Sequence, residues 1–263
     1  WIRSYKMGSA RFVIDRRMKS ILDSVTYKFC IQRGSHWLLS NVSLEIHQGE
    51  FVSVVGRSGS GKSTLLNLIA GFCSPVSGRI TNTLSTGYVL QECPLFPWLN
   101  VIDNVCSAVK GASPRRLSKD ELKDRALSLL QQVGLAGRQN HFPRELSGGE
   151  RSRASLAQIL ALDRELLLLD EPFASLDAFT RKDMNALLQQ IVSSRSLTVL
   201  LVTHDLEEAV FLSDRVLVMN GSKTGVGLEQ VISLPKPRTR HMCYSQEFLE
   251  HKELIEASMG LKI

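Results

Sequence analysis

Cysteine is scarce in this chain, and its few copies are not arranged to bind a metal. No two of them have the short spacing that is typical of zinc ligands. The five are Cys30, Cys73, Cys93, Cys106 and Cys243. An odd, scattered set of thiols favours reduced cysteines in a cytosolic protein over a disulfide framework.

Long apolar runs are also missing. No run approaches the roughly 18 residues that a bilayer-spanning helix needs. The most apolar stretch, residues 166–169, is short and is followed by two acidic residues. The N-terminus lacks the apolar segment of a signal peptide. We therefore expect a protein that is not exported and has no transmembrane helix.

Excess charge is confined to one end of the chain. The formal net charge is +6, and residues 1–20 carry +5 of it, from six basic residues and one acidic residue. A groove that binds nucleic acid would place its basic residues within the folded domain. We expect residues 1–20 to be a disordered basic leader rather than a tether to nucleic acid or anionic lipid, and we expect no nucleic-acid partner.

Short apolar segments alternate with helical patterns along the rest of the chain. Strands are predicted at 51–55, 87–90, 166–169, 199–202 and 216–219, and helices at 62–70, 119–133, 150–162 and 181–193. Nearly continuous apolar strands of this length suit a parallel sheet that is covered on both faces. The pattern predicts an α/β fold. Residues 92–146 interrupt the strand rhythm and predict an inserted helical subdomain.

Residues 56–63 read G-R-S-G-S-G-K-S, between a predicted strand and a predicted helix. Glycines allow the backbone to wrap closely around phosphates, and the start of the helix favours an anion. Lys62 would neutralise the β- and γ-phosphates of a nucleotide, and Ser63 would bind Mg²⁺. The predicted nucleotide-binding residues of this motif are Gly56, Arg57, Ser58, Gly59, Ser60, Gly61, Lys62, Ser63 and Thr64.

An apolar strand ends in Asp170 and Glu171, about a hundred residues after the phosphate loop. Open α/β sheets bind ligands at the carboxyl ends of their strands. Asp170 is predicted to hold Mg²⁺, and Glu171 to act as the general base that polarises the attacking water.

A third motif, Ser147, Gly148, Gly149 and Glu150, begins a predicted helix with exposed amide groups. With these three motifs in order, residues 21–240 resemble the nucleotide-binding subunit of ATP-binding-cassette (ABC) transporters. The resemblance implies a P-loop NTPase fold of the ABC type. That fold has a mostly parallel sheet core, an N-terminal antiparallel β subdomain and the helical subdomain, here followed by a C-terminal extension at 241–263.

The resemblance also implies roles for residues outside these motifs. Gln91 corresponds to the Q-loop glutamine, which senses Mg²⁺ and the membrane partner, and Asp177 lies in the D-loop. His204 corresponds to the switch histidine that contacts the γ-phosphate. Phe29 matches the aromatic residue that stacks on adenine, with Tyr27 as a competing candidate. Gln158 departs from the pattern, because a basic residue is frequent at its position.

Within the family, residues 94–105 resemble importers for nitrate, sulfonate, taurine and bicarbonate. In these importers the region forms the groove that receives a short helix of the permease, so Phe96 and Trp98 either anchor that partner or pack inside the helical subdomain. The resemblance implies a homodimer on the cytoplasmic face of the membrane, with ATP and Mg²⁺ as cofactors and a permease and a substrate-binding protein as partners. The alternatives are a soluble ABC ATPase that acts on nucleic acid or ribosomes, and an importer subunit for a thiamine-pyrimidine precursor.

Overall fold

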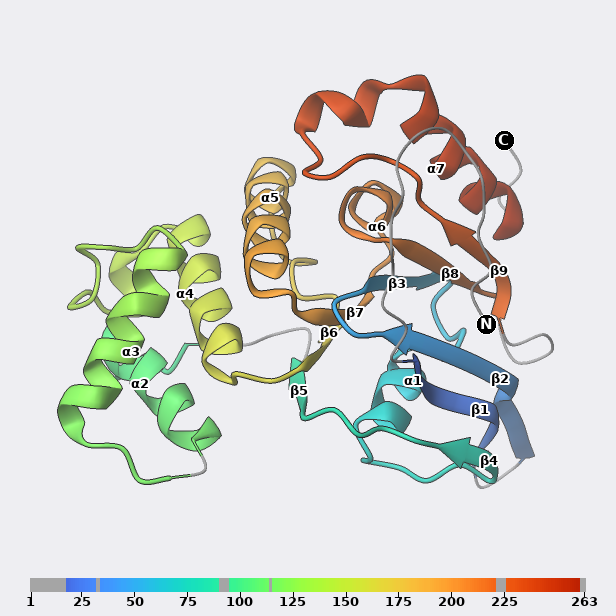
Figure 1. Ribbon diagram of the computed structural model, residues 1–263, viewed down its shortest axis with the longest axis horizontal. Coiled ribbons are helices and arrows are strands. Elements are labelled where there is room, and N and C mark those ends of the chain that lie inside the picture. Colours follow the sequence, from blue (N-terminus) through green and yellow to red (C-terminus); the bar gives the residue numbers. More distant parts are fainter. Residues whose placement is uncertain (1–17, 32–33, 90–94, 114, 221–225, 261–263) are drawn as a thin grey trace.

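A six-stranded sheet forms the centre of the molecule (Figure 1). The computed structural model describes residues 18–31, 34–89, 95–113, 115–220 and 226–260, with side chains described from residue 39 onward. The strand order is β5-β6-β7-β3-β8-β9, and all neighbours are parallel except β8 and β9. The strands are β3 (Phe51–Gly56), β5 (Thr86–Val89), β6 (Leu166–Asp170), β7 (Thr198–Val202), β8 (Arg215–Met219) and β9 (Val226–Val231). The predicted parallel core is confirmed, with β9 as an added edge strand.

A second, antiparallel sheet lies to one side of the first. It consists of β1 (Met18–Ile31), β2 (Gly34–His47) and β4 (Ser77–Ile80), in the order β2-β1-β4. Helix α1 (Lys62–Ile69) packs between the two sheets, and its buried leucines join one hydrophobic cluster with residues of β2, β3 and β6. This arrangement fixes the start of α1, and hence the phosphate loop, at the edge of the central sheet.

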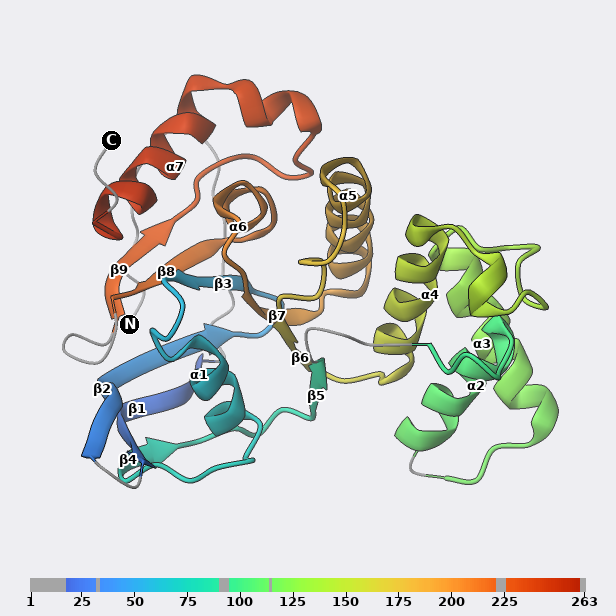
Figure 2. The same ribbon diagram turned by 180° about the vertical axis from the view of Figure 1, so that it is seen from behind.

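A helical layer stands apart from both sheets, at the opposite end of the molecule from β4 in both views (Figures 1 and 2). It contains α2 (Val101–Ala112), α3 (Lys119–Gln132), a 3₁₀ turn η1 (Pro143–Glu145) and α4 (Gly148–Ala161). Side chains cap each α-helix: Asn100 accepts from the Asp103 amide at 2.8 Å, and Ser118 and Ser147 close capping boxes. The fold class inferred from the resemblance, including the inserted helices, is confirmed.

Three helices cover the other face of the central sheet: α5 (Ala178–Arg195), α6 (Leu206–Leu212) and α7 (Gln246–Ser258). A 3₁₀ turn η2 (Arg240–Tyr244) precedes α7. The buried Arg238 guanidinium attaches this C-terminal part, because it donates to the carbonyls of Val210 (2.8 Å) and Ser213 (2.7 Å) at the end of α6. None of the helices in the described part of the chain has the length and apolar character that crossing a bilayer requires.

Candidate nucleotide site

The phosphate loop, residues 57–61, connects β3 to α1 as the sequence predicts. A Cβ atom at Gly56 would lie 2.5 Å from the Met219 carbonyl oxygen and 2.8 Å from Ser60 Oγ, so only glycine fits there. Gly61 directly precedes α1 with a φ of 98°, which also favours glycine. Ser60 Oγ is buried and has no hydrogen-bond partner among the described residues.

Lys62 lies across this loop. Its Nζ donates to the carbonyl oxygens of Gly56 (2.8 Å) and Arg57 (3.0 Å). Burial lowers the pKa of Lys62, and the nearby carboxylates of Glu171 and Asp170 act in the opposite direction. A phosphate placed in the loop would supply the charged partner that the ammonium lacks in this loop.

Asp170 ends β6 beside the start of α1. Burial raises the pKa of Asp170, while a hydrogen bond with the Ser63 side chain lowers it. Tyr88 Oη also donates to Asp170 Oδ2, at 3.4 Å. Two of the three predicted metal ligands, Ser63 and Asp170, are therefore hydrogen-bonded to each other.

Glu171 and His204 come from adjacent parallel strands. Glu171 follows β6, and its amide donates to the carbonyl of Val202, the last residue of β7, at 2.9 Å. Its φ of 48° is unusual for a residue with a side chain, and such backbone strain is common at functional sites. Glu171 Oε2 lies 3.0 Å from His204 Nδ1, and the His204 side chain is 60% exposed. The predicted base and the predicted switch histidine thus form a pair at the open edge of the sheet.

The Ser-Gly-Gly-Glu motif begins α4 in the helical layer, whereas the phosphate loop begins α1; the two helices are well separated in both views (Figures 1 and 2). Ser147 Oγ accepts from the Glu150 amide at 3.2 Å, and Glu150 Oε2 accepts from the Ser147 amide at 2.9 Å. The hydrogen bond from the Ser147 backbone amide is the main cause that lowers the pKa of Glu150. Glu150 therefore stabilises the helix start, while Gly148 stays exposed.

Of the remaining predicted site residues, the structure describes the side chain of Asp177 but not those of Gln91, Phe29 and Tyr27. Asp177 caps α5 by accepting from the amides of Phe179 and Thr180, both at 3.0 Å. Gln91 lies outside the described residues. Phe29 and Tyr27 lie on β1, in the part of the chain whose side chains are not described, so the choice between them stays a prediction.

The comparisons with known proteins agree with this geometry. The sequence profile of the family described as ABC transporter matches residues 39–174, just over half of the chain. The chain belongs to this family. An aliphatic sulfonates import ATP-binding protein of Nocardia farcinica is 44% identical over 232 residues, which cover 88% of this chain and 91% of that protein. The nitrate transport protein NasD of Klebsiella oxytoca is 41% identical over 228 residues, which cover 83% and 87%.

Solved structures of other ABC cassettes share the fold. The dimeric post-hydrolysis state of an ATP-binding cassette bound to ADP and Pi superposes with a TM-score of 0.69 at 31% sequence identity. The superposition covers 82% of this chain and all of that one. A nucleotide at the phosphate loop of the present cassette is consistent with the unpartnered Ser60 hydroxyl and with the position of Lys62.

The donor set near Asp170 fits Mg²⁺ better than a transition metal. No cluster of three or more His, Cys, Asp or Glu side chains suited to a metal occurs among the described residues. Mg²⁺ is usually held by one or two protein groups, waters and substrate phosphates, and the oxygens of Ser63 and Asp170 fit this donor set.

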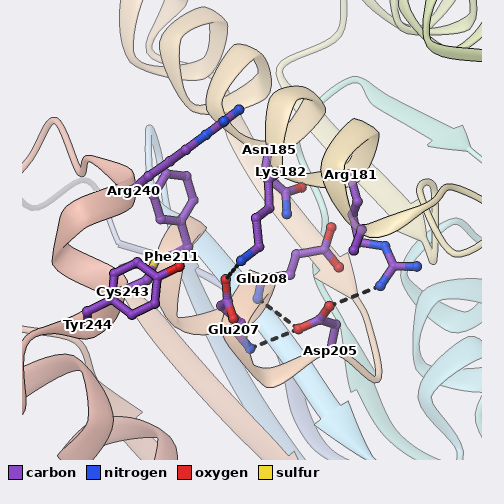
Figure 3. Close-up of a pocket in the computed structure, with 11 residues that line it drawn as sticks. Arg181, Lys182, Asn185, Asp205, Glu207, Glu208, Phe211, Arg240, Cys243 and Tyr244 are labelled. Carbon is purple, nitrogen blue, oxygen red and sulfur yellow. Dashed lines mark hydrogen bonds and ion pairs between the residues drawn. The ribbon is translucent and has the colours of Figure 1, made fainter.

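Sequence reasoning missed the residues behind the switch histidine. A cavity of about 270 Å³ lies there between α5, α6 and η2 (Figure 3). Arg181, Asp205 and Glu208 line it, and the first two form an ion pair at 3.2 Å. An arginine four residues after the Asp177 cap can be read from the sequence, but its charged partner, Asp205, lies 24 residues further along the chain.

Proposed function

We propose that this chain is the ATP-binding and ATP-hydrolysing subunit of an ABC importer. The contact of Glu171 with His204 carries the proposal, since a carboxylate and an imidazole at 3.0 Å can orient and deprotonate a water. The contact lies at the carboxyl ends of β6 and β7, beside the phosphate loop that follows the neighbouring β3. This is the edge where α/β sheets bind ligands.

Each predicted residue then has a defined role. Residues 56–64 bind the phosphates, and Lys62 stabilises the charge on the transferred phosphoryl group. Ser63, Asp170 and Gln91 hold Mg²⁺, which when bound supplies further neutralisation of the phosphates. Glu171 polarises the water, and His204 contacts the γ-phosphate.

The proposed working form is a head-to-tail homodimer. Residues 21–240 form the ATPase domain, and Ser147, Gly148 and Gly149 of one chain complete the phosphate site of the other. The separation of α4 from α1 supports this arrangement, because a single chain offers its phosphate loop and its exposed amides to different places. The dimeric relative bound to ADP and Pi supports it too.

The proposed partners are a membrane permease and a substrate-binding protein, with the homodimer attached to the cytoplasmic face of the membrane. The relatives are named for aliphatic sulfonates and nitrate, which are both small oxyanions. We propose a substrate of this class. Phe96 and Trp98 are 42% and 70% exposed, which favours a contact with the permease over a place in the core.

Two variants test the chemistry. Lys62→Ala removes the cation from the loop, so nucleotide affinity and turnover should both fall. Glu171→Gln keeps the shape but removes the base, so ATP should still bind while phosphate release drops about 10²-fold or more. Glu253→Gln, the same change at an exposed position of α7, serves as the matched control and should behave as wild type. Near-normal phosphate release by Glu171→Gln would disprove the assigned base.

A further inference from the structure

The side chain of Arg181 contacts two loops that are separate in the sequence. Its Nε donates to the Phe173 carbonyl at 3.3 Å, and its Nη2 donates to the carbonyls of Ala174 (3.4 Å) and Leu176 (2.8 Å). Its Nη1 donates to Asp205 Oδ2 at 3.2 Å, and Figure 3 shows this contact as a dashed line. One guanidinium therefore joins the loop after β6 to the loop after β7.

These two loops carry the proposed catalytic pair. The first starts at Glu171 and leads to the D-loop, Ser175 to Asp177, in which Ser175 and Asp177 are exposed and Leu176 is half-buried. The second holds His204 directly before Asp205. The D-loop is thus connected to the switch histidine through Arg181, in addition to the direct contact of Glu171 with His204.

Asp205 is well suited to this connection because its two carboxylate oxygens accept hydrogen bonds from different groups. Oδ1 caps α6 by accepting from the amides of Glu207 (2.9 Å) and Glu208 (3.2 Å). This leaves Oδ2 for Arg181. On the other side of His204, Thr203 is buried and its hydroxyl donates to Glu208. The backbone on either side of His204 is therefore anchored while the imidazole stays exposed.

We propose that Arg181 is a positioning residue that holds the D-loop and the switch histidine as one unit. When the D-loop of one chain contacts the other chain of the homodimer, Arg181 keeps the D-loop and the His204 loop in a fixed relative position. This position sets the distance between His204 and Glu171. Lysine is a poor substitute at position 181, because a single ammonium cannot match four acceptors as a planar guanidinium does. The inference rests on the proposed ATPase function for its catalytic consequence.

Arg181→Gln tests the proposal, with Lys182→Gln as the matched control. Lys182 is the next residue of α5, and its Nζ pairs with Glu207 in α6 at 2.8 Å. Arg181→Gln should lower kcat for ATP hydrolysis about tenfold or more, since small misplacements of reacting groups cost up to about 10²-fold. The affinity for MgADP and the melting temperature should match those of the control. Equal kcat for the two variants would overturn the proposal, and Arg181→Lys should restore only part of the loss.

A second variant covers the outcome in which Arg181→Gln does not fold well. Asp205→Asn keeps a good cap for α6, because Asn is a favoured N-cap residue, but it removes the charge that faces Arg181. Asp205→Asn alone should lower kcat for ATP hydrolysis while its MgADP affinity and melting temperature match those of Lys182→Gln, and an unchanged kcat would overturn the proposal. Where Arg181→Gln does fold, the Arg181→Gln/Asp205→Asn double variant should lose no more activity than Arg181→Gln alone, because the two residues form one link. Losses that multiply would show that the two residues act independently, and they would overturn the proposal.

Hydrogen exchange separates failure of this inference from failure of the proposed function. In Arg181→Gln, the amides of residues 173–177 and 203–205 should exchange faster together, relative to Lys182→Gln. Unchanged exchange in either loop overturns the link whatever the ATPase activity is. Faster exchange in both loops of Arg181→Gln, combined with a wild-type protein that releases no phosphate, would support the link and reject the ATPase function.

Discussion

Replacing Trp98 tests whether residues 95–100 form a docking surface. Trp98 is 70% exposed, and its ring lies 5.4 Å from that of Phe96. A tryptophan side chain buries at most about 250 Å², so the covered part here is about 75 Å². At about 25 cal/mol per Å², this corresponds to an upper limit of about 2 kcal/mol, and Trp98→Ala loses only part of it.

The loop itself does not depend on the two rings for its shape. The buried Asn104 side chain accepts from the Phe96 amide at 2.7 Å and donates to the carbonyls of Phe96 (3.2 Å) and Leu99 (3.0 Å). Trp98→Ala and Phe96→Ala should therefore leave the backbone in place. We expect basal ATPase activity to be retained and the melting temperature to fall by only a few degrees.

The assay measures two properties of each variant: its melting temperature, and its co-purification and solute uptake with the permease. Leu130→Ala, at a fully buried position of α3, is the control for a core residue and should cost about 2–5 kcal/mol. Trp98→Ala should remain stable but co-purify poorly with the permease and support little uptake. A melting temperature as low as that of Leu130→Ala would refute the exposure argument. Stable variants that still co-purify and transport normally would refute the docking surface.

Three further predictions concern stability and assembly. Arg238→Met leaves the carbonyls at the end of α6 without their donor and should lower the free energy of unfolding by about 3 kcal/mol, measured by denaturant titration. Burial raises the pKa of Glu208 to about 7, so the folded chain keeps a proton that the unfolded chain loses above about pH 4.5. Glu208 therefore contributes stability at low pH that is lost as pH rises from about 4.5 to about 7, by up to roughly 3 kcal/mol; titrations of Glu208→Gln across this range should lack that slope, and identical slopes would contradict the assignment. Ser147→Arg should leave nucleotide binding to the monomer intact but abolish ATP-induced dimers of a Glu171→Gln background in size-exclusion chromatography, and undiminished dimers would count against the shared site.

The sequence was sufficient for the parts of the fold that local patterns determine. The strand before Gly56 and the helix after Gly61 are recognisable because glycine spacing and apolar runs are short-range signals. The predicted helix 181–193 starts three residues late, since Asp177 is the actual cap and the apolar Phe179 of the first turn is exposed rather than part of a buried helical face. Helix α7 was not predicted, because its buried residues Phe248 and Ile255 are recognisable as core residues only once α7 is seen to pack on β9 and α6.

A long-range contact accounts for what the sequence did not reveal in the site. Three acceptors of Arg181 lie in the loop just before α5, but Asp205 lies 24 residues further along the chain, and no local pattern pairs it with Arg181. The capping role of Glu150 could have been predicted, because Ser followed three residues later by Glu is the capping-box signature. The exposure of Trp98 could not have been predicted, because an aromatic residue between Pro97 and Leu99 fits a surface and a core equally well.

The distance between α4 and α1 has a genetic consequence. In a head-to-tail homodimer, each ATP needs Lys62 from one subunit and Ser147 from the other. A homodimer of Lys62→Ala chains, or of Ser147→Arg chains, therefore has the defect in both of its ATP sites and should be inactive. When both chains are produced in one cell, mixed dimers contain one site with the intact Lys62 of one chain and the intact Ser147 of the other. Two defective alleles would then complement each other, whereas Lys62→Ala and Glu171→Gln, which damage the same half of the site, would not.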